Sequence, residues 1–284
     1  MAAAGRIAEL ETQVSKYERL VESMFEPEPD EKLYEIGGLI GVGGFGQVRK
    51  AKSRSNGKLV AIKAIRFDPE AKDAVFIRGM KNILSLKPDT NIVQFFDVFR
   101  GSQDTINYVM ELCDCDLNDF MKNRENRLLK NFFSIAHQTV RATHVLHSNS
   151  PPIIHRDIKP HNVLLQTKPN AIVVKLGDFD LSSRPHTSDR LKFDSLGTDG
   201  FKILHHLLTT IEGHGTKPFL GPEFFAAKGG DPDDDKMIFD SSSDIFALGL
   251  TFAYMFCYNT SDYGLYKLVY HKMRTDKSRL RTYA

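Results

Sequence analysis

The sequence predicts an α+β fold of two lobes, in which a small lobe rich in antiparallel strands precedes a larger helical lobe. Short apolar runs separated by tight turns fill residues 33–110, whereas apolar residues recur at helical spacing beyond residue 112. The chain has 284 residues, enough for one two-lobed unit of about 250 residues and a short extension. We therefore expect one domain at 33–284, with an N-lobe at about 33–110 and a C-lobe at about 114–284.

The segment before this domain predicts a helix followed by a linker. Apolar side chains alternate at spacings of three and four over residues 1–25, which is the pattern of a narrow helical seam: Ile7, Leu10, Val14, Tyr17, Val21 and Met24. A dimerising coiled coil is one interpretation, and a single amphipathic helix is the other. The short length favours the single helix. Two prolines in an acidic run make residues 26–32 a linker.

The small lobe is expected to contain five strands and one helix. The strands are Ile36–Ile40, Gln47–Lys52, Leu59–Ile65, Ile92–Phe99 and Ile106–Met110. A helical stretch near Glu70–Leu86 separates the third strand from the fourth. The turn Ser55-Asn56-Gly57-Lys58 is typical of an antiparallel hairpin.

The larger lobe is expected to be mainly helical. Residues Asp119–Lys122 and Leu128–Leu146 carry apolar side chains at helical spacing. Short strands within Ile153–Leu165 and at Val173–Leu176 should flank a polar loop.

Composition excludes several classes of protein. With 38 basic and 36 acidic residues the net charge is only +2, so no overall field favours nucleic acid or a membrane surface. The three cysteines, Cys113, Cys115 and Cys257, are too few and too unevenly spaced for a disulfide framework or a usual zinc site. No run of 18 apolar residues and no apolar leader segment is present. We expect a soluble protein of the cytoplasm or nucleus, without a nucleic-acid partner or a membrane span.

A glycine-rich segment, Gly41-Val42-Gly43-Gly44-Phe45-Gly46, follows one predicted strand and enters another. Such glycines allow backbone N–H groups to approach phosphate oxygens. In a dinucleotide-binding oxidoreductase they would open a helix, but Val48–Lys52 alternates as a strand does. A glycine-rich hairpin without a ligand is the alternative.

A lysine lies in an apolar strand about 17 residues beyond the glycine-rich segment. In Val60-Ala61-Ile62-Lys63, the lysine would be costly to bury unless it met an anion. An edge position with the amine reaching water is the alternative. Together with the glycines, Lys63 indicates phosphate binding.

The strongest signal is Ile154-His155-Arg156-Asp157-Ile158-Lys159-Pro160-His161-Asn162, followed by Asp178-Phe179-Asp180. Phosphoryl transfer needs positioning, charge neutralisation and a group that accepts the hydroxyl proton. Asp157 would take this proton and Lys159 would neutralise the phosphoryl group. Asn162 and Asp178 would hold Mg²⁺ through oxygen ligands. We disfavour a polar turn that contains these residue types by coincidence.

These motifs resemble the eukaryotic protein kinase superfamily, of the serine/threonine type, over residues 33–258. The wording of Met110–Cys113 and of the catalytic loop is most similar to inositol-requiring kinase/endoribonucleases, without a ribonuclease domain. The resemblance implies the cofactors ATP and Mg²⁺, and a substrate that is another protein or the chain itself. The residues that it assigns to ATP are Ile40, Gly41, Gly43, Gly46, Val48, Ala61, Lys63, Met110, Glu111, Cys113 and Leu165.

Two further segments carry the resemblance. Gly215–Glu223 is similar to the end of an activation segment. Asp244–Gly249 is similar to the buried helix whose aspartate braces the catalytic loop, although Asp244 could instead cap that helix.

The sequence departs from the family at several places. Gly79 takes the position of the glutamate that pairs with the strand lysine, so that a glutamate restored there would show whether the ion pair is limiting. Asp180 replaces the glycine of the metal motif. The long segment between Asp178 and Glu223 contains hydroxyl residues that, once phosphorylated, could be drawn to Arg156: Ser182, Ser183, Thr187, Ser188, Ser195, Thr198, Thr209 and Thr210.

The C-lobe also looks short after the Asp244 helix. These departures indicate impaired activity, and they leave a second hypothesis open. The chain could be a pseudokinase that binds nucleotide and acts as a scaffold or allosteric partner.

Overall fold

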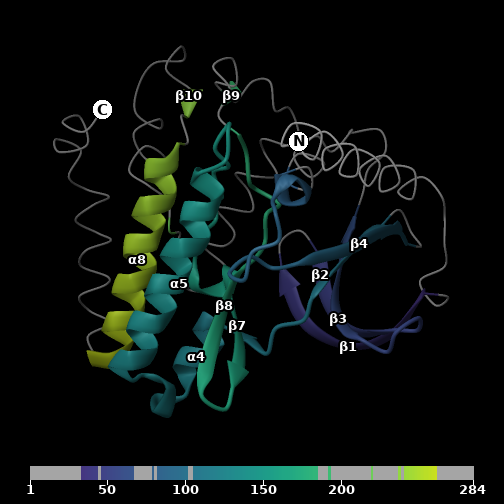
Figure 1. The fold of residues 1–284 in the computed structure, drawn as a ribbon, viewed down its shortest axis with the longest axis horizontal. Coiled ribbons are helices and arrows are strands. Elements are labelled where there is room, and N and C mark those ends of the chain that lie inside the picture. The colour runs from purple at the N-terminus through teal and green to yellow at the C-terminus, as the bar shows by residue number, and fades with distance from the viewer. Residues whose placement is uncertain are drawn as a thin grey trace, which may run out of the picture. The chain divides into compact units, whose positions relative to one another are not determined.

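The computed structural model describes 33–43, 46–66, 79, 82–101, 105–184, 191–192, 219, 236–237 and 240–260 (Figure 1). The expected N-terminal helix at 1–25, the linker at 26–32 and everything after residue 260 lie outside these residues. The contacts divide the chain into two compact units. The first holds the described residues up to 66 together with 83–88 and 93–113, and the second holds 79, 82, 89–92 and the residues from 114 onward.

The first unit is built on an antiparallel sheet with the strand order β1-β2-β3-β5-β4. Its strands are β1 (Tyr34–Gly43), β2 (Gly46–Ser53), β3 (Leu59–Arg66), β4 (Phe95–Arg100) and β5 (Thr105–Glu111). The expected small lobe of antiparallel strands is therefore confirmed. Its core combines Ala51, Val60, Ile62 and Val109 with Phe99, on which the ring of Tyr34 stacks at 5.7 Å.

The hairpin between β2 and β3 turns where the sequence predicts it. Ser53 N donates to Lys58 O at 2.9 Å, and Gly57 N donates to Ser53 O at 2.8 Å. Gly57 has a φ of 71°, in the left-handed region where a Cβ atom meets the following carbonyl oxygen. Glycine is therefore the residue that closes this turn without strain.

The second unit is mainly helical, as expected. Its helices are α4 (Leu117–Lys122), α5 (Leu129–His147) and α8 (Ser241–Thr260), with the short 3-10 helices η1 (Arg124–Asn126) and η2 (Pro160–Asn162). The strands β6 (Cys115–Asp116), β7 (Val163–Lys168) and β8 (Ala171–Leu176) form a small sheet in that order. Two short strands, β9 (Leu191–Lys192) and β10 (Lys236–Met237), pair with each other. Helices α5 and α8 lie side by side (Figure 1).

For two predicted elements, the described strand or helix covers only part of the predicted range. Of the predicted strand Ile92–Phe99, only the residues from Phe95 onward are in β4. Ile92 instead forms a parallel bridge with Leu176, because the neighbouring Asn91 is anchored by its side-chain amide, which donates to Val174 O at 3.0 Å. Of the predicted helix Glu70–Leu86, the described helical residues are 79 and 82–85.

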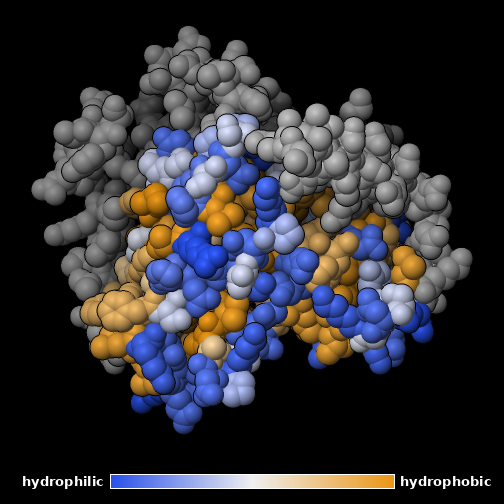
Figure 2. All heavy atoms as spheres, in the orientation of Figure 1, coloured by the Kyte–Doolittle hydropathy of each residue, from blue (hydrophilic) through white to orange (hydrophobic). Residues whose placement is uncertain are grey.

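The surface of the described residues mixes polar and apolar side chains (Figure 2). Apolar surface gathers beside the lower ends of α5 and α8 in this view (Figure 2). Leu129 and Phe133 of α5 and Phe256 of α8 are exposed apolar residues. In the part of the chain that the structure describes, no helix combines the length and the apolar character needed to cross a membrane.

The Gly57 turn gives a test of the hairpin. Gly57→Ala should lower the free energy of unfolding by about 1–2 kcal/mol, measured with denaturant. The alanine would have to keep the positive φ of this position, although the nearest atom to its Cβ is 3.8 Å away. Gly38→Ala is the matched control, since a Cβ at Gly38 meets nothing within 4 Å and its φ is not positive. Equal losses in the two variants would contradict the backbone explanation.

Candidate active site

The predicted catalytic residues come together in the loop that leads into β7. Lys159 Nζ lies 2.9 Å from Asp157 Oδ2, and Asn162 Nδ2 donates to the same oxygen at 2.8 Å. The Asn162 amide also donates to Asp157 O at 2.7 Å. Asp157 and Lys159 have side chains only 11% and 13% exposed, so that both charges are held in a largely dehydrated place, where electrostatic interactions are stronger than in water.

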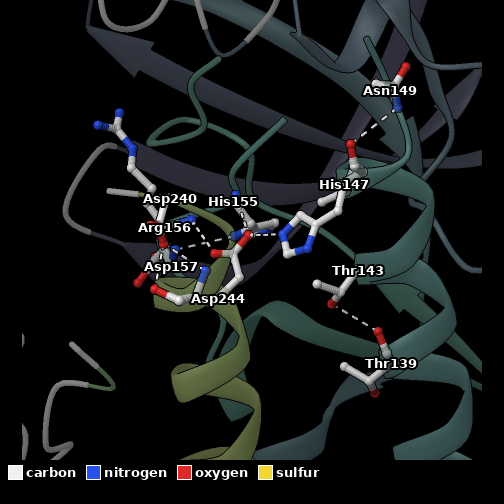
Figure 3. A network of polar contacts seen from close by, with 11 residues as sticks. Thr139, Thr143, His147, Asn149, His155, Arg156, Asp157, Asp240 and Asp244 are labelled. Atoms are coloured by element: carbon white, nitrogen blue, oxygen red, sulfur yellow. Dashed lines mark hydrogen bonds and ion pairs between the residues drawn. The ribbon is translucent and has the colours of Figure 1, made fainter. Parts of the chain in front are cut away.

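A buried carboxylate on α8 holds the start of this loop (Figure 3). Asp244 is fully buried, and its Oδ2 accepts from His155 N at 2.8 Å while Oδ1 accepts from Arg156 N at 2.8 Å. His147 Nε2 on α5 donates to Oδ2 at 2.8 Å. Three donors thus satisfy one buried charge, which would be costly without them.

The alternative role of Asp244, as the cap of its own helix, is filled by another residue. Asp240 Oδ1 accepts from Ser242 N at 2.7 Å, as an N-cap side chain does. Asp244 lies in the first turn of α8 and directs its carboxylate to the loop. The expected brace is therefore present in the structure.

The same loop is connected to the predicted metal motif through His155 and Asn162. His155 is fully buried, with Nε2 3.0 Å from Gly177 O and its ring 4.9 Å from the ring of Phe179. Asn162 O accepts from Gly177 N at 3.0 Å. The residue immediately before Asp178 is therefore tied to the catalytic loop from two sides.

Two residues around the site have unusual backbone angles. Among the described non-glycine residues, positive φ occurs at Arg156, with 65°, and at Asp178, with 62°. Non-glycine residues in this region are uncommon and concentrate at functional sites. Asp180 is not among them, so that the aspartate that replaces the family's glycine sits in a conformation open to any residue.

Gly79 has no free space beside it for a larger side chain. A Cβ built on this helical glycine would lie 2.5 Å from Phe179 O and 3.1 Å from both the Cα and the O atom of Asp180. Side-chain atoms at such a distance from backbone are not tolerated without a shift. A glutamate at this position would therefore require the helix or the backbone of residues 179–180 to shift.

Two of the proposed phosphorylation positions are also corrected. Ser182 is fully buried and Ser183 is 8% exposed. Ser183 exchanges backbone hydrogen bonds with Ile154, at 2.9 and 2.7 Å. These hydroxyl groups are packed in the interior and are not accessible to a kinase in this structure. The remaining candidates, from Thr187 to Thr210, lie outside the described residues.

The predicted phosphate anchor is buried within the first unit. Lys63 is 7% exposed and stands in β3, where it pairs with Val48 of β2 and with Tyr108 of β5. It is therefore not an edge-strand residue whose amine simply reaches water. Ala61 lies two residues earlier on the same strand and is 5% exposed.

Packing explains one glycine of the glycine-rich segment and leaves another unexplained. A Cβ at Gly46 would collide with Ala64 O of the neighbouring strand, so that β2 and β3 require a glycine there. A Cβ at Gly41 would make only an ordinary contact with Val48, at 3.8 Å. Gly43 pairs with Gly46 in the sheet, and Gly44 lies outside the described residues.

The other residues assigned to ATP are distributed over both units. Ile40 on β1 is 52% exposed. Met110 and Glu111 end β5, and Cys113 follows them, all half-buried. Leu165 belongs to the second unit, where it is fully buried in β7 and pairs with Cys115.

His161 has no role of its own in the sequence motifs, and the structure places it half-buried in η2. Burial lowers the pKa of its imidazole below the usual range, against the raising effect of the Asp116 carboxylate. Burial also raises the pKa of Asp116, although a hydrogen bond from Asp119 N opposes this shift. His161 is adjacent in the chain to Asn162, one of the predicted catalytic residues, and its partial burial is a property that only the structure provides.

A match that extends over most of the chain decides the family. The sequence model of the protein kinase domain matches residues 34–277. The chain belongs to the protein kinase family. This kinase thus combines a sheet-based first unit with a helical second unit, as the α+β prediction requires.

Characterised relatives support the serine/threonine type. The chain is 35% identical over 196 residues to human NUAK family SNF1-like kinase 2. The aligned region covers 67% of this chain and 28% of that protein. The chain is 31% identical over 211 residues to human serine/threonine-protein kinase tousled-like 1, covering 72% and 26%, and 28% identical over 233 residues to tousled-like 2 of Xenopus tropicalis, covering 80% and 31%. The chain therefore spans about a quarter to a third of the length of these relatives. These matches do not support the narrower resemblance to inositol-requiring kinase/endoribonucleases.

Removing the charge of Asp244 should disrupt the loop. Asp244→Asn replaces one acceptor oxygen with a donor that faces a backbone N–H, so that we expect a loss of about 3 kcal/mol in the free energy of unfolding. Denaturant unfolding measures it. Asp240→Asn is the matched control, because asparagine caps a helix as well as aspartate does. A loss in Asp244→Asn no larger than in the control would contradict the assigned brace.

The half-buried His161 should make stability depend on pH. The unfolded chain binds a proton on this residue near pH 6.5, whereas the folded chain resists it because burial lowers the pKa. Stability should therefore fall as the pH is lowered through about 6.5. His161→Gln does not titrate, so that the difference in Tm between the parent and this variant should change between pH 7.5 and pH 5.5. A constant difference would show that His161 is protonated equally in both states.

Proposed function

We propose that this kinase transfers the γ-phosphoryl group of ATP to a serine or threonine hydroxyl of a protein, or of itself. The observation that carries this proposal is the cluster in which one carboxylate, Asp157, contacts both Lys159 and Asn162 within 3 Å. A base, a cation and an amide held this closely match the needs of phosphoryl transfer. The serine/threonine relatives support the choice of hydroxyl substrate.

In this mechanism Asp157 orients the substrate hydroxyl and accepts its proton. Both of its side-chain contacts fall on Oδ2, so that we assign Oδ1 to the hydroxyl. The hydroxyl oxygen forms a bond to the γ-phosphorus as the bond from the γ-phosphorus to the bridging oxygen breaks, and ADP leaves with the electron pair. Lys159 neutralises the charge of the transferring group.

The donor set fits Mg²⁺. Because Asn162 uses Nδ2 toward Asp157, its amide oxygen faces away from that carboxylate and can serve as a ligand, together with a carboxylate oxygen of Asp178. Among the described residues no cluster of three or more histidine, cysteine or acidic side chains could form a complete metal cage. Mg²⁺ usually binds one or two protein oxygens along with substrate phosphates, and when bound it would neutralise phosphate charge.

The first unit would bind the rest of the nucleotide. Lys63 is a buried cation that we assign to the α- and β-phosphates. Packing does not explain why position 41 carries a glycine. Gly41 would let the backbone approach these phosphates. The other residues assigned to ATP from the resemblance keep these roles as part of the proposal.

A pseudokinase remains the second candidate function. It is favoured by the glycine at position 79, because a glutamate that would hold Lys63 is missing there, and by Asp180 in the metal motif. In that case the chain would bind nucleotide and act through its surfaces. Dimerisation through residues 1–25 also stays a prediction from the sequence.

One assay separates the two functions. The purified chain with Mg²⁺ and labelled ATP should incorporate phosphate into itself or a general protein substrate, and Asp157→Ala should reduce this incorporation by at least about a thousandfold, since the proton acceptor and the positioning of Lys159 are both lost. Glu125→Ala, an exposed acidic residue of η1, should retain activity. Nucleotide-induced thermal stabilisation without transfer in the parent chain would establish the pseudokinase instead.

A further inference from the structure

The metal motif and the residues after it, 178–184, are fixed to the catalytic loop along one side. Ile154 N donates to Ser183 O at 2.7 Å, and Ser183 N donates back to Ile154 O at 2.9 Å. Arg156 Nε donates to Leu181 O at 2.5 Å. On this side the segment therefore cannot shift without breaking backbone hydrogen bonds.

A helix residue lies against the same segment through its backbone. Gly79 is buried, and a Cβ at this position would approach Phe179 O to 2.5 Å and Asp180 O to 3.1 Å. The absence of a side chain is what allows this distance. Asn82 is another described residue of this helix, and it belongs to the same compact unit as Gly79 and residues 178–184.

Asn82 adds a polar connection that has a defined direction. Its side chain is 3% exposed, and Nδ2 donates to Ser182 Oγ at 3.1 Å. Oδ1 accepts from Arg184 Nε at 3.2 Å, and Arg184 Nη1 donates to Pro151 O at 3.0 Å. A buried amide that uses both its donor and its acceptor fixes its own rotation and that of its partners.

We propose that Gly79 and Asn82 are positioning residues for Asp178. The glycine sets how closely the helix approaches Phe179 and Asp180, and the asparagine sets the register of the segment through Ser182. Together they hold Asp178 in its left-handed conformation, with φ of 62°. This proposal rests on the proposed function, because Asp178 is assigned there to Mg²⁺, and it makes the glycine a requirement of the site.

Two other considerations predict the opposite result for substitutions at Gly79. Alanine is a better helix former than glycine, so that a helix-only view predicts that Gly79→Ala stabilises the protein. The expectation of a missing ion pair predicts that Gly79→Glu raises the rate. Close docking predicts that both substitutions push the helix away from Phe179 and release the metal motif.

The experiment compares four single variants and one double variant of the full chain with two matched controls. The variants are Gly79→Ala, Gly79→Glu, Asn82→Leu and Ser182→Ala, and the double variant of the last two completes a cycle. Gly249→Glu is the control for the glycine, since Gly249 is a helical glycine whose Cβ would meet nothing within 4 Å. Asn131→Leu is the control for the amide, since Asn131 Nδ2 donates to Asn126 O at 2.8 Å, away from the metal motif.

The first readout is amide hydrogen exchange of residues 178–184, which needs no activity. We expect at least about tenfold faster exchange there in Gly79→Glu and Asn82→Leu, a smaller rise in Gly79→Ala, and no local change in the controls. The effects of Asn82→Leu and Ser182→Ala should be less than additive, because both remove the same contact. Unchanged exchange in Gly79→Glu and Asn82→Leu overturns the proposal.

The second readout is the Mg²⁺ concentration for half-maximal phosphate transfer. It should rise by at least about fivefold in Gly79→Glu and Asn82→Leu, beyond any change in Tm, because a displaced Asp178 binds the metal less well. A rate gain in Gly79→Glu contradicts the proposal. If the parent chain transfers no phosphate, the proposed function fails alone, and the exchange measurement still decides whether this docking exists.

Discussion

The geometry of the catalytic loop depends on one fully buried carboxylate. Asp244 receives hydrogen bonds from two successive backbone N–H groups, those of His155 and Arg156, and from the ring of His147. A charge in this place is stable only while all its donors are present. The positive φ of Arg156 is unfavourable, and these hydrogen bonds offset its cost. They thereby set the direction in which the chain continues to Asp157.

From this carboxylate a continuous set of contacts reaches the metal motif. His155 receives the Asp244 bond on its backbone and contacts Gly177 and Phe179 with its ring. The motif is then supported on its other side by Gly79, through backbone proximity. The metal motif is therefore enclosed by packed groups on both sides.

The sequence predicted the two-part architecture well because strand alternation and helical spacing are local properties of the chain. The hairpin at Gly57 and the cluster of Asp157, Lys159 and Asn162 follow from short motifs, whose spacing is determined within a single loop. The meaning of Gly79 could not be predicted in the same way. It depends on a backbone oxygen of Phe179, 100 residues away in the chain, and an alignment that marks a missing glutamate gives no information on what fills its space. The partial burial of His161 is likewise a property of the tertiary structure.

The bonds to Asp244 also have a consequence for how the protein is made. They join positions 88, 89 and 97 residues apart in the chain, and contacts of such long range must overcome a loop-closure entropy that local contacts avoid. During synthesis, which proceeds from the N-terminus, the segment around Asp157 leaves the ribosome well before its carboxylate partner does. The nascent chain therefore carries a catalytic loop without its anchor until α8 has been translated, and the order of the chain itself delays the appearance of a competent site.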